Sequence, residues 1–350
     1  MATLKEIAEE SSVSIATVSN ILNGKGNVSE ETAKKVLKIA QKYNYVPNIY
    51  ARNLKSQSLN IIGVITEDLT IFHTPEIVDG INYYCEKQGY SFVLGNMRLY
   101  KLYQDAYFFS DQYHKRVEDE ISVMLSNQIK GFVYVGGHNR DIHCLPQGLP
   151  VPVVCAYCYT DVDGIPTVTA DDMQAGRMAT EILLDAGCRQ IGVIAGPATD
   201  PCTQDRLLGY QSAMYTRGLL FNPNYVRYGP WDSEFGYRAA KSLFDQGVRD
   251  FFTMSDLTAI GVMDYASEHG LTVGKDYSLI GVNANAVSGN YSTHFSTMSM
   301  SLFEIGSQAA EVLLNLVERK EKSASVIKVP CTYIDRNSVV QRNSPQIRAL

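Results

Sequence analysis

Small and polar side chains cluster in an Ile-Ala-Thr-Val-Ser-Asn segment that begins at Ile15. Helical spacing would place Ile15, Ala16, Thr17, Ser19 and Asn20 on the exposed side of a helix, leaving the valine to face a core. The amide of Asn20 can bond the edge of adenine. We therefore predict that these five side chains contact base edges in the major groove of DNA.

The residues before this segment predict a first helix that would support it. Leu4, Ile7 and Ala8 recur at helical spacing. Thr3 and Glu6 have the spacing of a capping box, in which each side chain bonds the backbone of the other residue. A short amphipathic helix is therefore expected from about residue 4.

A tight turn at Val13 and Ser14 leads into the second helix, which Ser14 can cap. The buried stripe of this helix is predicted to consist of Val18, Ile21 and Leu22. Two short helices joined in this way form a helix-turn-helix, which places the N-terminal part of its second helix in the major groove.

A third helix, opened by Ser29, is expected to provide the platform for the first two. Its predicted buried face consists of Ala33, Val36, Leu37 and Ala40. An ordinary three-helix bundle shows the same spacing, so periodicity alone leaves both interpretations open.

The whole N-terminal string resembles the DNA-binding headpiece of the LacI family of bacterial transcription regulators. The matching stretches are Thr3-Leu4-Lys5-Glu6-Ile7-Ala8, Val13-Ser14, Ala16-Thr17-Val18-Ser19, Leu22-Asn23-Gly24, Val28-Ser29-Glu30-Glu31-Thr32, Tyr45-Val46-Pro47-Asn48 and Ala51-Arg52-Asn53-Leu54, the last resembling the family's hinge helix. The resemblance implies DNA contacts from Thr3, Ser14, Ile15, Ala16, Thr17, Ser19, Asn20, Asn23, Val28, Tyr45, Asn48, Ala51, Arg52, Leu54 and Lys55.

Two features of this headpiece bear on its DNA site. Asn20 stands where many family members carry Arg, which favours guanine, so the operator half-site is expected to differ from the commonest one. Pro47 ends the third helix region, Asn48 can cap the hinge helix, and Leu54 is placed to wedge between base steps of the minor groove.

The charge is distributed unevenly along the chain. Residues 1–57 hold eight Lys and Arg against five Glu, a net charge of +3, whereas the whole chain carries −6, which leaves −9 for the remainder. A basic head suits phosphate contacts, and an acidic body limits indiscriminate binding to nucleic acid.

Composition and cysteine usage indicate a cytoplasmic protein, and the family resemblance implies a bacterial one that is associated with the nucleoid when bound to DNA. No apolar run approaches the roughly 20 residues of a membrane span, and the start of the chain does not read as a secretory signal. Seven scattered cysteines suit reduced thiols, and the pair Cys155 and Cys158 is interpreted as two buried thiols. We expect neither a metal nor a cofactor.

After Ser58 the pattern changes to alternating strands and helices, which predicts parallel sheets covered on both faces. The fold class expected is an all-α headpiece joined to an α/β body of two doubly wound lobes. The expected boundaries are 1–47 for the headpiece, 48–59 for the hinge helix and linker, and 60–340 for the body, with an N-lobe of 60–164 and 296–322 and a C-lobe of 165–295 and 323–340.

From Ile61 to about Ser338 the body resembles the periplasmic-binding-protein-like sensor of the same family, through stretches such as Asp205-Arg206 and Arg336-Asn337-Ser338. The resemblance implies a homodimer, a small ligand between the lobes, and a closure that reorients the hinge helices. In open α/β sheets, ligands bind at the carboxyl ends of the strands.

The effector candidates lie in such strand-end loops, and each has a plainer alternative. Arg206 could bond a sugar diol or form a salt bridge with Asp205; Trp231 could stack on a ring or belong to the core. His73 could be a solvated loop histidine, and Asp256 could cap a helix. The full set of candidates is His73, Thr74, Asp200, Arg206, Trp231, Asp256 and Asn283, the last standing where many members have Asp.

The stretch 97–117 is rich in aromatic residues and longer than is usual for the family. It is expected to pack on the first lobe or at a dimer interface, and a lid or a docking surface for a partner protein is the alternative. Its aromatic residues are Tyr100, Tyr103, Tyr107, Phe108, Phe109 and Tyr113.

These features together predict a ligand-responsive, sequence-specific repressor of carbohydrate-related genes that binds a palindromic operator as a homodimer. The alternatives are a solute-binding receptor and a regulator controlled by a partner protein. The sequence contains neither a phosphate-binding G-x-x-x-x-G-K-[ST] loop nor a G-x-S-x-G elbow, so an enzyme is not expected.

Overall fold

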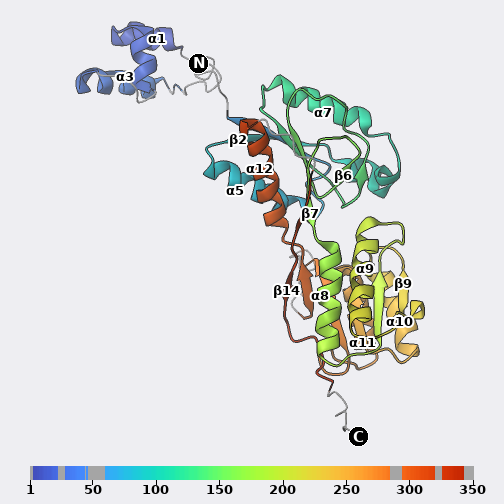
Figure 1. The fold of residues 1–350 in the computed structure, drawn as a ribbon. Coiled ribbons are helices and arrows are strands. Elements are labelled where there is room, and N and C mark those ends of the chain that lie inside the picture. Colours follow the sequence, from blue (N-terminus) through green and yellow to red (C-terminus); the bar gives the residue numbers. More distant parts are fainter. Residues whose placement is uncertain are drawn as a thin grey trace. The chain divides into compact units, whose positions relative to one another are not determined.

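The computed structural model describes residues 3–22, 28–43, 45, 60–283, 294–319 and 325–342. The chain separates into two compact units, residues 1–59 and 60–350 (Figure 1). The predicted hinge helix, residues 48–59, lies outside the described residues.

The first unit is a bundle of three short helices, α1 (Leu4–Ser11), α2 (Ile15–Leu22) and α3 (Glu30–Lys42). Ser12 is left-handed, with φ 58°, and begins the turn between α1 and α2. The core that the three helices share consists of Ile7, Ala8, Val18, Val36, Ile39 and Ala40.

One predicted core position of α3 is wrong. Leu37 is 50% exposed, and Ile39 is buried in its place. On a helix, Val36, Ile39 and Ala40 share one face because they are three and four residues apart, whereas Leu37 lies about 100° away from Val36.

The N-lobe of the body is built on a six-stranded parallel sheet whose strands are mostly buried. Its strand order is β13 (Val326–Val329), β7 (Thr167–Ala170), β5 (Val153–Ala156), β3 (Phe132–Val135), β1 (Ile61–Thr66) and β2 (Ser91–Asn96). Two helices, α5 (Thr74–Lys87) and α12 (Leu302–Arg319), pack against each other, and α12 also covers β3, β5 and β7. α7 (His114–Ser126) packs on β1 and β2.

The aromatic-rich stretch forms α6 (Leu99–Tyr103) and the 3-10 helix η1 (Gln104–Phe109), and it packs on the N-lobe as expected. Tyr107 and Tyr113 are buried in the same core cluster as Phe132 of β3, with Tyr103 and Phe108 packed against it. A small sheet of β4 (Asp141–Ile142) and β6 (Tyr159–Thr160) lies in the same lobe.

The C-lobe is built on a second six-stranded sheet, parallel except for β14, which runs antiparallel to β12. Its strand order is β14 (Thr332–Ile334), β12 (Ser296–Ser299), β11 (Ser278–Asn283), β10 (Asp250–Thr253), β8 (Ile191–Ala195) and β9 (Val226–Tyr228). The helices of this lobe are α8 (Asp172–Asp185), α9 (Pro201–Thr216), η2 (Pro223–Tyr225), α10 (Ser233–Asp245) and α11 (Asp256–Glu268).

Three strands belong to the lobe opposite to the one expected. β7 and β13 pair with each other in the N-lobe sheet, and β12 pairs with β11 in the C-lobe sheet. β13 and β14, separated by only two residues in sequence, lie in different sheets. Pro330 lies between them, and proline cannot donate a ladder hydrogen bond, so the chain changes lobes there.

Within the described part of the chain, no helix is both long enough and apolar enough to cross a membrane.

Candidate functional site

Helix α2 presents the side chains that the sequence assigned to base contacts. Ile15, Ala16 and Asn20 are exposed, Thr17 and Ser19 are half-buried, and Val18 is fully buried in the core below them. The helix start is fixed by exposed Ser14, whose Oγ accepts the backbone N–H of Thr17 at 3.0 Å. In a helix-turn-helix, the exposed side of the second helix enters the major groove. Helix α2 has such an exposed side, and Val18 attaches its other side to the core.

The remaining headpiece candidates differ in exposure. Thr3 is exposed and forms the predicted capping box: its backbone N–H donates to Glu6 Oε2 at 2.6 Å, and Glu6 N–H donates to Thr3 Oγ1 at 3.3 Å. Val28 is 38% exposed, and Tyr45 is half-buried. Six candidates lie outside the described residues: Asn23, Asn48, Ala51, Arg52, Leu54 and Lys55.

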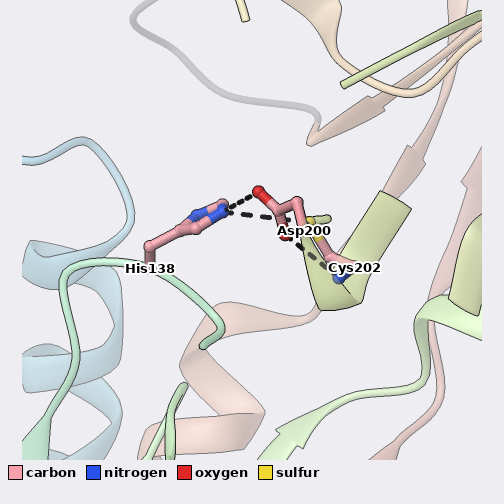
Figure 2. Close-up of side chains that lie close together, drawn as sticks. All are labelled: His138, Asp200 and Cys202. Carbon is pink, nitrogen blue, oxygen red and sulfur yellow. Dashed lines mark hydrogen bonds and ion pairs between the residues drawn. The ribbon is translucent and has the colours of Figure 1, made fainter. Parts of the chain in front are cut away.

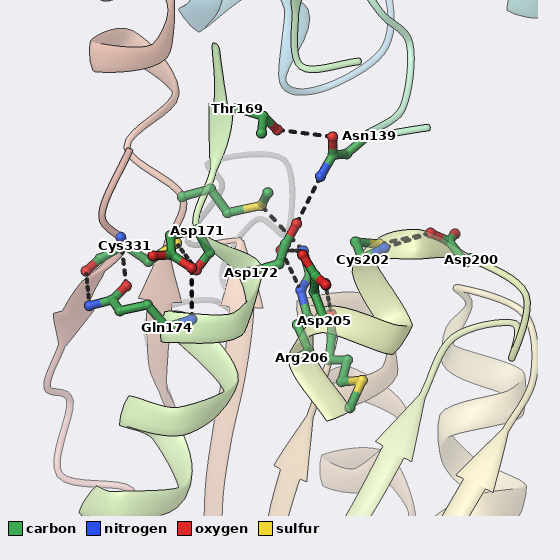
Figure 3. Close-up of polar contacts among 12 residues, drawn as sticks. Asn139, Thr169, Asp171, Asp172, Gln174, Asp200, Cys202, Asp205, Arg206 and Cys331 are labelled. Carbon is green, nitrogen blue, oxygen red and sulfur yellow. Dashed lines mark hydrogen bonds and ion pairs between the residues drawn. The ribbon is translucent and has the colours of Figure 1, made fainter. Parts of the chain in front are cut away.

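In the body, polar loops at the carboxyl ends of strands from the two lobes meet. His138 follows β3 of the N-lobe, and its Nε2 lies 2.6 Å from Oδ2 of Asp200, which follows β8 of the C-lobe (Figure 2). Next to it, Asn139 Nδ2 donates to Oδ2 of Asp172 at 2.9 Å (Figure 3). The edges of the two sheets that hold the carboxyl ends of the strands therefore face each other, and open α/β folds bind ligands at such edges.

Glu67, immediately after β1, holds the loop that carries His138 and Asn139. Its carboxylate is fully buried and accepts hydrogen bonds from Gly137 N–H at 2.6 Å and from Arg140 Nη2 at 3.0 Å. Gly137 and Arg140 flank His138 and Asn139 in the loop. By binding the first pair, the carboxylate of Glu67 fixes the loop on both sides of the second pair, which reaches the other lobe.

Arg206 lies in the second turn of α9, a helix that begins at Pro201. Its guanidinium is buried and pairs with Asp172, with Nε–Oδ1 at 2.8 Å and Nη2–Oδ1 at 2.7 Å, and it also donates to the carbonyl of Met254 (Figure 3). Burial alone would lower the pKa of Arg206, but the charge of Asp172 raises it above its ordinary value. The predicted alternative, a pair with Asp205, is wrong, because Asp205 pairs with Lys328.

Trp231 is brought beside Asp200 and Arg206. A Cβ added to Gly196 would overlap Cζ2 of the indole, so the ring packs directly on that glycine backbone. Its Nε1 donates to Oδ2 of Asp200 at 3.3 Å, and Cζ of Arg206 lies 5.9 Å from the ring centroid. Burial alone would raise the pKa of Asp200, but the hydrogen bonds that the carboxylate accepts, first from His138, lower it to about 2.

His73 and Thr74 lie on the N-lobe side of the site, at the start of α5. His73 is 2% exposed, so it is not a solvated loop histidine; its ring lies 4.4 Å from that of Tyr157, and burial lowers its pKa to about 3. Its Nδ1 and the Oγ1 of Thr74 are buried with no hydrogen-bond partner among the described residues, as is Oγ1 of Thr203 in α9. Buried polar atoms are rarely left unpaired, which makes these three atoms candidate ligand contacts.

Asp256 and Asn283 are placed differently. Asp256 is the first residue of α11, but Ser255 caps that helix by accepting from the N–H of Leu257 at 3.2 Å. Buried Asp256 accepts instead from Oγ1 of Thr297 in the same lobe, at 2.8 Å. Asn283 ends β11, is half-buried and has φ 129°, an uncommon backbone conformation for asparagine.

Comparison with known proteins agrees with both units. Residues 3–48 match the model of the bacterial regulatory proteins of the lacI family, and residues 180–339 match a periplasmic binding protein-like domain. The chain is 28% identical to catabolite control protein A of Priestia megaterium, over 94% of this chain and 96% of that one. It is also 28% identical to the ribose operon repressor of Haemophilus influenzae, over 97% and 99% of the two chains. The chain therefore carries a lacI-family DNA-binding domain and a periplasmic-binding-protein-like domain.

Solved structures show the same fold. The Lac repressor bound to ONPG superimposes with a TM-score of 0.74 at 21% identity, over 97% of this chain and 99% of that one. A complex of the transcriptional regulator CelR with cellobiose gives a TM-score of 0.62 at 22% identity, over 97% and 100% of the two chains.

Several residues contribute to the site without having been predicted from sequence. They lie on four separate loops or helices, and no local motif marks them. The strand-end rule would have found His138 and Asn139, which lie in the loop after β3, and Tyr157, which directly follows β5. The missed residues are His138, Asn139, Tyr157, Asp172, Cys202 and Thr203.

Proposed function

We propose that this protein represses transcription by binding a palindromic operator as a homodimer in the bacterial cytoplasm, and that a small molecule bound between the lobes controls its affinity for DNA. The observation that carries the proposal is helix α2, on which Ile15, Ala16 and Asn20 are exposed above a buried Val18. The relatives named as a repressor and a catabolite control protein support this, as does a Lac repressor structure described as a dimer bound to operator and an anti-inducer.

For the effector we propose a sugar or sugar derivative. The indole of Trp231 offers a flat apolar face, while Asp200 and Arg206 beside it offer an acceptor and donors. The unpaired atoms of His73 and Thr74 add polar contacts on the N-lobe side. The cellobiose bound to CelR and the ONPG bound to the Lac repressor are consistent with this ligand class. We include Asp256 and Asn283 among the effector contacts.

The operator proposal is tested by selecting preferred DNA sites for the parent and for Asn20→Arg. Changing an amide to a guanidinium should shift base preference at one position of each half-site, by about 1–3 kcal/mol. Because the substitution also adds a positive charge, Gln41→Arg, at an exposed position of α3, is the matched control. Identical preferred half-sites for the parent and Asn20→Arg would refute the assignment of α2 as the reading helix.

The effector proposal is tested by thermal shift against sugars, sugar phosphates and purines. A ligand that binds only the folded protein raises the melting temperature. Trp231→Ala should abolish the shift of the active compound, whereas Tyr215→Ala, which removes an aromatic ring that is 83% exposed at the far end of α9, should retain it. Equal shifts in both variants would mean that the compound binds at another site. The competing proposal is regulation by a partner protein.

A further inference from the structure

Three potential metal ligands from both lobes converge (Figure 2), and one of them accepts the indole N–H of Trp231. They are Nε2 of His138, a carboxylate oxygen of Asp200 and Sγ of Cys202, all within 4.8 Å of one another. Sγ of Cys202 lies 3.0 Å from Oδ1 of Asp200 and 4.0 Å from Nε2 of His138, whose distance from Oδ2 of Asp200 is 2.6 Å. Each atom is of a type that coordinates transition metals in proteins.

These separations are close to those of a tetrahedral zinc site. Zinc bonds of about 2.0–2.3 Å to nitrogen, oxygen and sulfur place neighbouring ligand atoms roughly 3.3–3.6 Å apart. The thiol of Cys202 and the imidazole of His138 would approach each other by about 0.4 Å. The carboxylate of Asp200 would move away from the imidazole by about 0.7 Å and from the thiol by about 0.6 Å. Side-chain rotations of this size need no change in the backbone.

We propose that His138, Asp200 and Cys202 bind one divalent transition metal ion, for which Zn²⁺ is the best match. A thiolate together with an imidazole selects such ions over Mg²⁺ and Ca²⁺, which prefer oxygen ligands. On binding, the hydrogen bonds from the thiol of Cys202 and from Nε2 of His138 to Asp200 are replaced by bonds to the metal. The thiol proton is released to solvent, and the imidazole coordinates through Nε2 as the tautomer protonated on Nδ1. Three protein ligands leave a fourth position for water or for a group of a small molecule.

The surroundings of the cluster support a coordinating role for Asp200. Its carboxylate also accepts the indole N–H of Trp231 at 3.3 Å and the backbone N–H of Cys202 at 3.2 Å. Outer hydrogen bonds of this kind orient metal ligands and are costly to remove. They hold Asp200 in place whether or not an ion is bound.

The ion would join the two lobes. His138 belongs to the N-lobe, whereas Asp200 and Cys202 belong to the C-lobe, so neither lobe alone supplies three ligands. Metal binding is then coupled to the relative orientation of the lobes and stabilises the arrangement in which the strand ends face each other. This site shares Asp200 with the proposed effector contacts, but the proposal does not rest on a sugar effector.

The test uses the full chain freed of metal by dialysis against a chelator under reducing conditions. Zn²⁺ is titrated in competition with a chromophoric chelator, and Co²⁺ is used to detect thiolate-to-metal charge transfer. One ion per chain is expected, together with a higher melting temperature and a change in Trp231 fluorescence. His138→Gln and Cys202→Ser should each weaken binding by at least about 100-fold, because even loss of an outer hydrogen bond costs about 10–100-fold.

Matched controls separate this site from other histidines and thiols. His143 is exposed and pairs with Asp161, and Cys331 is buried like Cys202, so His143→Gln and Cys331→Ser should bind Zn²⁺ as the parent does. Failure of the parent to bind Zn²⁺, or equal affinity in the site and control variants, would overturn the proposal. The titration contains neither DNA nor sugar, so this failure would leave operator binding, measured separately by gel shift, unaffected.

Discussion

Replacing Asp172 by Asn should strongly destabilise the body, because it leaves the guanidinium of Arg206 buried without a counter-charge. The two side chains are 1% and 3% exposed, and their closest atoms lie 2.7 Å apart. Removing one partner of such a pair costs about 3–5 kcal/mol. Since a whole domain is stabilised by about 5–15 kcal/mol, the loss should be a large fraction of the total.

The assay is urea unfolding followed by the fluorescence of Trp231, the only tryptophan in the chain, which reports on the body alone. Asp205→Asn is the matched control: it makes the same substitution one residue before Arg206, in a pair with Lys328 whose side chains are 32% and 36% exposed. Exposed pairs contribute about 0–1 kcal/mol, so the control should unfold close to the parent.

A double variant decides whether the uncompensated charge is the cause. Adding Arg206→Met to Asp172→Asn removes the buried charge itself, and replacing buried pairs by uncharged side chains is often nearly neutral. The double variant should therefore be more stable than Asp172→Asn alone. If the second substitution lowered the stability further, or if Asp172→Asn matched Asp205→Asn, the reasoning would be refuted.

Three further outcomes follow from the same structure. Burial lowers the pKa of His73 from 6.5 to about 3, so protonation favours the unfolded state. The free energy of unfolding therefore falls as the pH drops below 6.5. In urea unfolding, the parent should lose about 1 kcal/mol more than His73→Gln between pH 7.5 and 5.5. Gly196→Ala should displace the indole of Trp231 and shift its emission to the red, and unchanged emission would contradict the packing described. Thr3→Ala should cost the headpiece about 1 kcal/mol by removing the capping box, seen as severalfold faster amide exchange in α1 but not in α12.

Local patterns predicted the helix-turn-helix and most elements of the body well. Capping by Thr3 and the buried stripe through Val18 are local in sequence, and the structure confirms both. The strand β8, Ile191–Ala195, is an uninterrupted apolar run, which identifies a strand buried on both faces. Elements that mix polar and apolar residues, such as β7, were missed.

Long-range assignments were harder to predict. Which lobe a strand joins depends on pairing between segments far apart in sequence, as for β7 with β13, and neither strand encodes its partner. The same holds for the site: His138 and Asp200 are 62 residues apart, and Asn139 and Asp172 are 33 apart. Strand-end position was the one signal that pointed to His138, whereas the role of Cys202 follows only from the three-dimensional arrangement.

The contacts between the lobes indicate how small a bias would be needed to switch this protein. The bonds of His138 to Asp200 and of Asn139 to Asp172 connect the strand-end loops of the two lobes. A hydrogen bond contributes about 0.5–1.5 kcal/mol net, or about 1.5–3 kcal/mol where a charged group takes part, so these two together are worth a few kcal/mol. Coupling between an effector site and a second binding site typically amounts to 1–3 kcal/mol. A ligand that bridges or displaces these two contacts therefore acts on the same energy scale as the switch it would control.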